Sequence, residues 1–298
     1  MQVNPQYLTN VSQAIDQTSA MEQQLTEELS NGTTIQQLSD NPTAVGENVG
    51  LNAAIMQDDS YEQTASSSGS MLQVTDAALG NVVSQLNQAI SISTEGNNGT
   101  LNSSQEQDIA TQLEGIRDQV LSLANTSYLG QYLFSGSSNA QPFTLDSSTT
   151  PATVTYNGDN AVNTIATPEG QQIALNVPGS HIFTSSTGNV LGTLNSLIND
   201  YSTGNIKQAQ ADSANLSTAL NTVSQQRIVI DNSISRLTAT STYAQTQSTQ
   251  LQAAQTNLMQ ADLAGISTQL KDAETQQAAL SEVFSSLGSQ SLFNYING

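Results

Sequence analysis

The chain has 298 residues, of which 36% are hydrophobic and 4% aromatic, and it contains neither Cys nor Trp. Large apolar residues are scarce for one compact globule of this length, whereas a bundle of narrow helices buries only one stripe of each helix. Five basic against 25 acidic residues give a formal net charge of -20, and no Lys or Arg precedes Arg117. Because nucleic acid and anionic lipid both require a basic surface, we expect neither as a partner. Without Cys, disulfide bonds and thiolate chemistry are excluded.

The first residues, MQVNPQYLTNVSQAID, contain neither the basic nor the apolar region of a secretory signal. No stretch approaches about 18 consecutive apolar residues, so we expect no membrane span. Export of this chain would therefore use a route that does not read such a signal.

The first third of the chain has the apolar periodicity of helices. A first stripe with alternating spacings of three and four runs from Leu8 to Leu29, and Thr18 and Glu22 are its polar exceptions. Asn31-Gly32 then signals a turn. The apolar members of this stripe are Leu8, Val11, Ile15, Leu25 and Leu29.

A second helix is expected to begin near Pro42, where Asp40 or Asn41 can serve as the N-cap. Its apolar positions continue to Ile92, across the weak stretch SSSGS at 66–70. After the turn EGNNGTLNSS, a third helix is predicted from a stripe that is apolar at every position. That stripe consists of Ile109, Leu113, Ile116, Val120 and Leu123.

The pattern changes to that of β-strands at 136–188. Most of the prolines fall here, together with the β-favouring runs TPATVTYNGD and QQIALNVPGSHIF and turns at Asn157-Gly158 and Pro178-Gly179. A small β-rich domain is therefore predicted at 136–188. The stretch YLFSGSSNAQPF marks its boundary with the helices, and we expect the domain junction to be closed by Tyr132, Leu133, Phe134, Gly136, Pro142 and Phe143.

Helical periodicity resumes at Val190 and persists without a proline almost to the end of the sequence. One stripe consists of Leu216, Leu220, Val223, Arg227, Ile230, Ile234 and Leu237. Another consists of Met259, Leu263, Ile266, Leu270, Ala273, Gln277, Leu280, Phe284 and Leu287. A continuous helix from 206 to 288 would be about 120 Å long, which no compact domain of this size accommodates. We therefore expect a mainly α protein with a small β-rich insertion, an elongated rod of long antiparallel helices built from both chain ends.

Three parts follow from this pattern. They are a terminal helical assembly domain (1–40 plus 255–298), a helical rod domain (41–135 plus 189–254) and the β-rich domain (136–188). The two terminal stripes either pack on each other as an intramolecular coiled coil or become ordered mainly against neighbouring subunits. Because two helices alone bury little surface, the second interpretation is favoured.

Several stretches of the sequence, in their order, resemble the flagellin superfamily. LSNGTTIQQLSDNPTAVGENV resembles the segment between its first two helices, and ADLAGISTQLKDAETQQAALSEVFSSLGSQSLFNYI resembles its C-terminal helix. ANTSYLGQYLFSGSSNAQPF and VTYNGDNAVNTIATPEGQQIALNVPGSHIF resemble the branch that joins the flagellar hook to the filament. Within the second of these, the resemblance lies in Tyr156, Gly158 and Asp159 and in Gly179 to Phe183. Pro42, the Leu133-to-Gly136 stretch and the small β module favour that branch over flagellin itself.

The resemblance implies a structural subunit that is exported unfolded through the flagellar type III channel and forms a ring in the extracellular flagellum. Implied partners are further copies of the chain, a hook-associated protein on the hook side, flagellin on the filament side and an export chaperone. The implied assembly interface lies on the two terminal stripes, at Leu8, Val11, Ile15, Leu25, Leu29, Leu263, Ile266, Leu270, Leu280, Phe284 and Leu287. The alternatives are a filament subunit and a secreted coiled-coil adhesin or effector.

Catalytic chemistry finds little support in the sequence. The one histidine, His181, lies in a β pattern and is expected to be structural or exposed. No GxSxG, P-loop or Gly-rich dinucleotide turn is present. Asp58 and Asp59 are adjacent on a predicted helix, so their side chains diverge by about 100° and are expected to lie on a solvated face. We therefore expect no catalytic residue, no metal and no cofactor.

Overall fold

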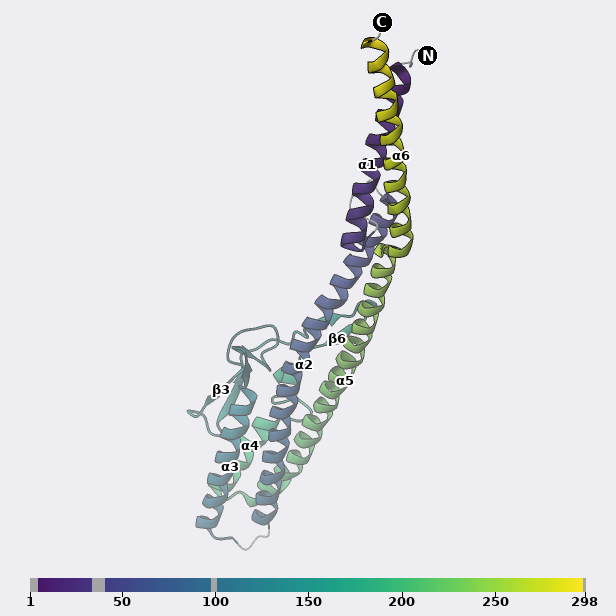
Figure 1. Cartoon of the computed structure of the whole chain (residues 1–298). Helices are drawn as coiled ribbons and strands as arrows, with labels where there is room; N and C mark the ends of the chain where they lie inside the picture. Colours follow the sequence, from purple (N-terminus) through teal and green to yellow (C-terminus); the bar gives the residue numbers. More distant parts are fainter. Residues whose placement is uncertain (1–4, 34–40, 98–100, 297–298) are drawn as a thin grey trace. The chain divides into compact units, whose positions relative to one another are not determined.

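The computed structural model describes residues 5–33, 41–97 and 101–296, which form helices and short antiparallel β-hairpins (Figure 1). The mainly α fold with a small β-rich insertion is thus confirmed. Packing divides the described residues into two compact units, one within 1–56 and 247–298 and the other within 57–246. The helices are α1 (Pro5–Asn31), α2 (Pro42–Gly96), α3 (Ser103–Ala124), α4 (Val190–Thr203), α5 (Ile206–Met259) and α6 (Leu263–Ile296).

Helices α2, α3, α4 and α6 begin after residues whose side chains cap free backbone N–H groups. Asn102 forms a capping box at α3, because its Oδ1 accepts from the Gln105 N–H at 3.0 Å while the Gln105 Oε1 accepts from the Asn102 N–H at 3.0 Å. At the start of α2 the Asn41 Oδ1 accepts from the Ala44 N–H at 3.1 Å. Asn41, one of the two residues predicted as the N-cap of this helix, is therefore the one that caps it. Gly204 ends α4 with a left-handed φ of 72°.

Three antiparallel hairpins lie between α3 and α4 in the sequence. Their strands are β1 (Ser127–Tyr128), β2 (Gln131–Tyr132), β3 (Phe143–Asp146), β4 (Thr153–Tyr156), β5 (Thr164–Ala166) and β6 (Gln172–Ala174). In the β3–β4 hairpin Phe143 faces Tyr156, and in the β5–β6 hairpin Ile165 faces Ile173. A single 3-10 turn, η1 (Gly179–His181), follows these strands.

The unit within 57–246 has one hydrophobic core to which both helices and hairpins contribute. The apolar stripes predicted within α2, α3, α4 and α5 face this core, which includes Leu72, Leu79, Val82, Leu86, Leu113, Val120, Leu194, Leu216, Val223 and Leu237. Phe143, Ile173 and Phe183 of the 136–188 segment are fully buried in the same core. The hairpins are therefore packed directly on the helices. Independent folding of 136–188 stays a prediction.

The predicted continuous helix from 206 to 288 is wrong, since α5 ends at Met259 and α6 begins at Leu263. The Gln260 N–H still donates to the Thr256 carbonyl of α5 at 2.8 Å, but the next backbone groups bond to the segment after α1. Thr33 and Gln260 form an antiparallel bridge, and the Ala261 N–H donates to the Gly32 carbonyl at 3.0 Å. A backbone N–H group that bonds to another segment cannot also bond to the carbonyl four residues earlier in its own helix. These tertiary bonds therefore end α5, although no proline is present.

Arg227, the polar exception in the α5 stripe, forms an ion pair with Asp76 of α2. Its Nε donates to Asp76 Oδ1 at 2.7 Å and its Nη2 donates to Asp76 Oδ2 at 3.0 Å. The hydrogen bond to Asp76 raises the pKa of Arg227. This two-point geometry joins α2 to α5 within one unit and explains a charge in an otherwise apolar stripe.

No helix among the described residues has both the length and the apolar character needed to cross a membrane.

Candidate assembly interface

Helices α1 and α6 lie side by side and antiparallel within one unit (Figure 1). Their shared core is small. Among the described side chains it consists of Leu25, Ala261, Ile266 and Ala273, with Leu270 half-buried against them. Two of these five residues are alanines, so the pair buries much less apolar surface than the unit within 57–246 does.

The polar exceptions in the two terminal stripes meet each other across this helix pair. With its amide turned so that the nitrogen faces Glu22, the Gln277 side chain donates to both Glu22 carboxylate oxygens, at 2.9 and 2.8 Å. The buried Thr18 hydroxyl donates to the Ala14 carbonyl of its own helix at 2.9 Å. A single polar pair in an apolar seam favours one register over its neighbours, because any shift leaves these groups unpaired.

The loop at the base of the helix pair is held by backbone and capping bonds. Besides the Thr33–Gln260 bridge, the Asp262 Oδ1 accepts from the Ala264 and Gly265 N–H groups at 3.2 and 3.1 Å. A carboxylate at this position also complements the positive end of the α6 dipole. The direction of α6 relative to α1 is therefore set by bonds as well as by apolar contact.

The predicted assembly residues are brought together on α1 and α6 but differ in burial. Val11, Leu25 and Ile266 are buried, and Ile15, Leu270 and Leu280 are half-buried. By contrast, Leu29, Leu263 and Phe284 are exposed by 36%, 48% and 42%. The side chains of Leu8 and Leu287 lie outside the described part of the structure. Within one chain, then, three large apolar side chains of the two stripes remain open to solvent.

Periodicity missed three further exposed apolar residues in the same helices. They are Tyr7, Met21 and Val283, which are exposed by 53%, 56% and 40%. Each of them lies three or four residues from a member of a stripe and directly beside the residue that was assigned to it, namely Leu8, Glu22 and Phe284. Spacing alone could therefore have found them, and it does not distinguish between two adjacent positions. Val283 precedes Phe284 directly, and together these two widen the exposed apolar surface of α6.

The predicted domain-junction residues lie in the core of the other unit. Leu133, Phe134, Gly136, Pro142 and Phe143 are buried, and Tyr132 is half-buried. The Phe134 and Phe143 rings each pack edge-on against Phe183, with ring centroids 5.2 Å apart in both pairs. Such edge-to-face contacts add to the burial of the rings.

Three motifs that are far apart in the sequence converge beside these rings. The Tyr156 hydroxyl lies 2.9 Å from the Phe134 carbonyl and 2.7 Å from the Asp159 carbonyl. The Gly179 N–H donates to the Phe134 carbonyl at 2.9 Å. Hydrogen bonds from Ser137 to the Asp159 carboxylate lower the pKa of Asp159, whereas burial raises the pKa of Tyr156. The motif residues thus form a hydrogen-bonded cluster around the Phe134 carbonyl, and this cluster holds the hairpins on the helices.

The titratable residues that the sequence singled out, His181, Asp58 and Asp59, differ in their exposure to solvent. His181 is exposed, as one of the two expectations had it. The expected solvated face is wrong for Asp58, which is only 3% exposed, while Asp59 is exposed. The helix turns by about 100° between adjacent residues and points one carboxylate inward. Burial, followed by repulsion from Asp59 and Glu169, raises the pKa of Asp58. Among the described residues no group of three or more His, Asp or Glu side chains is placed to hold a metal.

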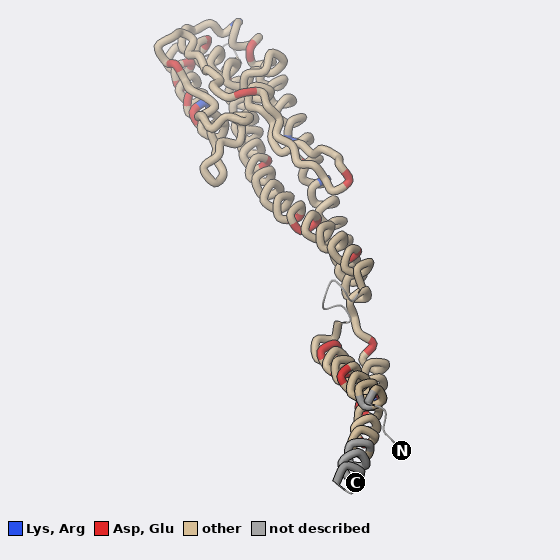
Figure 2. Tube along the Cα trace, turned by 90° about the horizontal axis from the view of Figure 1, so that it is seen from above, with Lys and Arg blue, Asp and Glu red and all other residues tan. Residues whose placement is uncertain are grey.

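Acidic residues outnumber basic residues along the whole chain. Figure 2 shows few Lys and Arg among many Asp and Glu, and the acidic residues are spread over the trace. Neighbouring Lys and Arg residues are separated by at least nine positions in the sequence.

Comparison with known proteins defines the class. Residues 3–139 match the family model of the bacterial flagellin N-terminal helical region. The predicted resemblance to the flagellin superfamily is therefore confirmed for residues 3–139, a little under half of the chain.

Within the superfamily the chain is similar to flagellar hook-associated protein 3 of Salmonella typhimurium. The two are 29% identical over 187 residues, which cover 62% of this chain and 57% of the relative. The match therefore spans little more than half the length of that relative.

Two solved structures share the fold. A flagellar hook-associated protein of Vibrio parahaemolyticus has a TM-score of 0.66 and 19% identity, covering 74% of this chain and 100% of that chain. The flagellar junction protein FlgL of Legionella pneumophila has a TM-score of 0.57 and 15% identity, covering 72% of this chain and 100% of that chain.

Proposed function

We propose that this chain is a structural subunit of the bacterial flagellum that forms the ring between hook and filament. The observation that carries the proposal is the α1–α6 pair, whose small core leaves Leu29, Leu263 and Phe284 open to solvent. The similarity to a flagellar hook-associated protein 3 and to a junction protein supports the same role. In the ring, these exposed side chains pack against the terminal helices of adjacent copies.

The energetic argument rests on symmetry. Complete burial of a Val or Phe side chain contributes about 1.5–3 kcal/mol, and a ring repeats each contact once per subunit. Contacts that are too weak to hold two chains therefore become sufficient in a closed assembly. The three-part division of the chain, with 1–40 and 255–298 as the assembly part, belongs to this proposal. So do the hook-side protein, flagellin and an export chaperone as partners, and an extracellular location.

The proposal is tested by complementing a strain that lacks this gene with a Val283→Asp/Phe284→Asp variant. Two carboxylates at the exposed apolar surface should abolish filament attachment and release filament protein into the medium, because charges cannot be buried unpaired in the subunit contacts. Monomer unfolding should change little, since both side chains are already exposed by 40% or more in the single chain.

The matched control is Ala278→Asp/Ser285→Asp. Both positions are exposed, and at about 100° per residue they lie on the opposite side of α6 from Val283 and Phe284. This variant adds the same charge and should still anchor filaments. Equal motility of the two variants would contradict the proposed interface.

The filament-subunit alternative gives a different result in the same strain. If the chain were flagellin, its deletion would leave no filament protein in the medium, whereas loss of a junction subunit leaves filament protein to be secreted without attachment.

A further inference from the structure

Leu129 is the most exposed large hydrophobic side chain among the described residues, at 90%. Together with Gly130 it forms the two-residue turn of the β1–β2 hairpin, in which Tyr128 pairs with Gln131. Both turn residues have a positive φ, 51° at Leu129 and 83° at Gly130. Turns of this kind favour Asn, Asp and Gly, because a bulky side chain is strained at positive φ. A Leu at this position is therefore unfavourable to the single chain both in its backbone and in its exposure.

The β1–β2 hairpin holds this side chain in a fixed place. Tyr128 is half-buried against the hydrophobic core, and Leu133, directly after the hairpin, is buried in it. The Leu133 N–H donates to the Thr126 carbonyl at 3.0 Å. No charged residue occurs from 119 to 145 in the sequence. The turn thus presents one apolar side chain on an uncharged surface.

An apolar groove of about 270 Å³ lies on the same unit, between α2 and the β5–β6 hairpin. This groove, called the α2 groove below, is lined by Gln57, Ser60, Tyr61, Thr64, Ile165, Ala166, Thr167 and Pro168. Pockets that bind small organic ligands enclose about 300–1,000 Å³. The α2 groove is smaller than that range and suits one or two side chains.

Three hydroxyl groups in the walls of the α2 groove are already bonded within the chain. The Thr64 hydroxyl donates to the carbonyl four residues earlier at 2.9 Å, and the Thr167 hydroxyl accepts from the Gln171 N–H at 3.1 Å. The Tyr61 hydroxyl bonds to the Thr240 hydroxyl of α5. Because these groups have partners in their own chain, the groove favours an apolar occupant.

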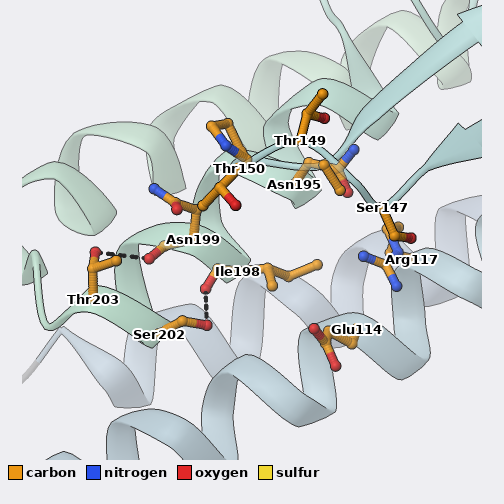
Figure 3. Close-up of a pocket in the computed structure, with 12 residues that line it drawn as sticks. Glu114, Arg117, Ser147, Thr149, Thr150, Asn195, Ile198, Asn199, Ser202 and Thr203 are labelled. Atoms are coloured by element: carbon orange, nitrogen blue, oxygen red, sulfur yellow. Dashed lines mark hydrogen bonds between the residues drawn. The ribbon is translucent and has the colours of Figure 1, made fainter.

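A second hollow, also of about 270 Å³, lies between α3, α4 and the loop that joins β3 to β4 (Figure 3). Its walls include the charged side chains of Glu114 and Arg117. An apolar occupant would cover these charges without pairing them, which is unfavourable. Of the two hollows, the α2 groove is therefore the one that fits a leucine side chain.

Charge selects which surface of a second copy fits the α2 groove. Glu62 directly follows Tyr61, and Glu169 directly follows Pro168, so acidic residues border the groove. Because the chain has a net charge of -20, most charged surfaces of a second copy would be repelled there. The uncharged β1–β2 turn is not repelled.

We propose that Leu129 of one copy inserts into the α2 groove of a second copy of this chain. The inference rests on the proposed ring function and adds a contact outside the α1–α6 pair. Because the side chain and the groove lie on different elements, the contact is head-to-tail and repeats from copy to copy around a ring. Burial of Leu129 there offsets the free energy that its backbone and its exposure cost in the single chain.

The test uses engineered thiols, which report this contact without background because the chain contains no Cys. One cell expresses a Leu129→Cys copy and a Thr64→Cys copy in place of the wild-type chain, and its isolated flagella are treated with a short bismaleimide. A covalent dimer should form in this mixture and in neither variant alone, because the two thiols meet only between copies. Gln225→Cys replaces Thr64→Cys in the matched control, since Gln225 is exposed and does not line the groove.

The possible results separate this contact from the ring function. Flagella that contain both variants without a dimer would overturn the contact and leave the ring function standing. Absence of the chain from the flagella would overturn the ring function and the contact with it. A dimer of Leu129→Cys alone, an equal yield in the Gln225→Cys control, or an adduct with a different protein would overturn the α2 groove as the docking site.

A Leu129→Asn variant separates stability from assembly. Asn adopts a positive φ more readily than Leu, so the unfolding temperature of the monomer should stay the same or rise. Filament attachment in the deletion strain should nevertheless decrease, because the apolar contact is lost. Val162→Asn removes another exposed apolar side chain, 49% exposed, and should leave attachment unchanged. Attachment at the wild-type level in Leu129→Asn, or an equal loss in the two variants, would overturn the proposal.

Discussion

Asp200, in the last turn of α4, should make the stability of this protein depend on pH in an unusual direction. Asp200 is 4% exposed, and its Oδ2 has no hydrogen-bond partner among the described residues. Burial, followed by the nearby Asp212 carboxylate, raises the pKa of Asp200 to about 6 from the ordinary 3.8. The folded state therefore holds this proton more tightly than the unfolded state does. Its stabilising contribution is complete below the unfolded pKa and is lost as the pH rises through the folded pKa.

The perturbation is Asp200→Asn, which keeps the shape of the side chain and removes its ionisation. The gap between about 6 and 3.8 corresponds to about 3 kcal/mol at 1.36 kcal/mol per pH unit. Near pH 8 the variant should be more stable than wild type by up to this amount, or by about 6–12 °C in Tm for a unit of this size. Near pH 4, where the wild-type carboxyl is already protonated in the folded state, the two should unfold at nearly the same temperature.

The assay is thermal unfolding followed by far-ultraviolet circular dichroism across this pH range, with the difference in Tm between variant and wild type as the readout. Asp108→Asn, which removes an exposed carboxylate of α3, is the matched control for the loss of one negative charge. The reasoning fails if the Asp200→Asn difference is constant with pH, or if the variant is less stable than wild type at the alkaline end.

Three further predictions concern the hydrogen-bonded cluster around the Phe134 carbonyl and the termini. Gly136→Ala should destabilise by at least about 2 kcal/mol in denaturant unfolding, because Gly136 has a φ of 75° and an added Cβ would collide with Asp159. Gly130→Ala, with a φ of 83° and open space, should cost only the backbone strain, and equal losses would rule out the collision. Tyr156→Phe should lower the free energy of unfolding by about 1–2 kcal/mol, because it removes the hydroxyl contacts with the Phe134 and Asp159 carbonyls. An unchanged free energy of unfolding would mean that these hydrogen bonds do not stabilise the fold. Limited proteolysis of the monomer should trim 1–40 and 255–298 before the rest, and uniform resistance would mean that these ends do not depend on assembly for their order.

Local sequence signals predicted the helices and their buried faces. The stripe from Ile109 to Leu123 lies in α3, with Ile109, Leu113, Ile116 and Val120 buried and Leu123 half-buried. The predicted N-cap at Asn41 is also in place. These features could be predicted because a helix repeats every 3.6 residues and its ends need caps, so both are determined by residues only a few positions apart.

The partners of the polar residues were decided only by tertiary structure. Glu22 and Gln277 interrupt two stripes that lie at opposite ends of the sequence, and the fold brings them into hydrogen-bond contact. Arg227 likewise interrupts a stripe and pairs with Asp76. From the sequence each of these is only an exception to a pattern, because the identity of a long-range partner depends on how whole helices are registered against each other.

The break between α5 and α6 and the burial of Asp58 have the same origin. No proline or glycine run marks residues 260–262, yet Ala261 donates to Gly32 from the far side of the chain. Asp58 and Asp59 are chemically identical neighbours, and only the direction in which α2 turns makes one buried and the other exposed. The sequence by itself determined which segments are helices, which faces are apolar and which superfamily they resemble. Tertiary structure decided where those helices stop and which polar groups lose their water, because both depend on contacts between residues that are distant in the chain.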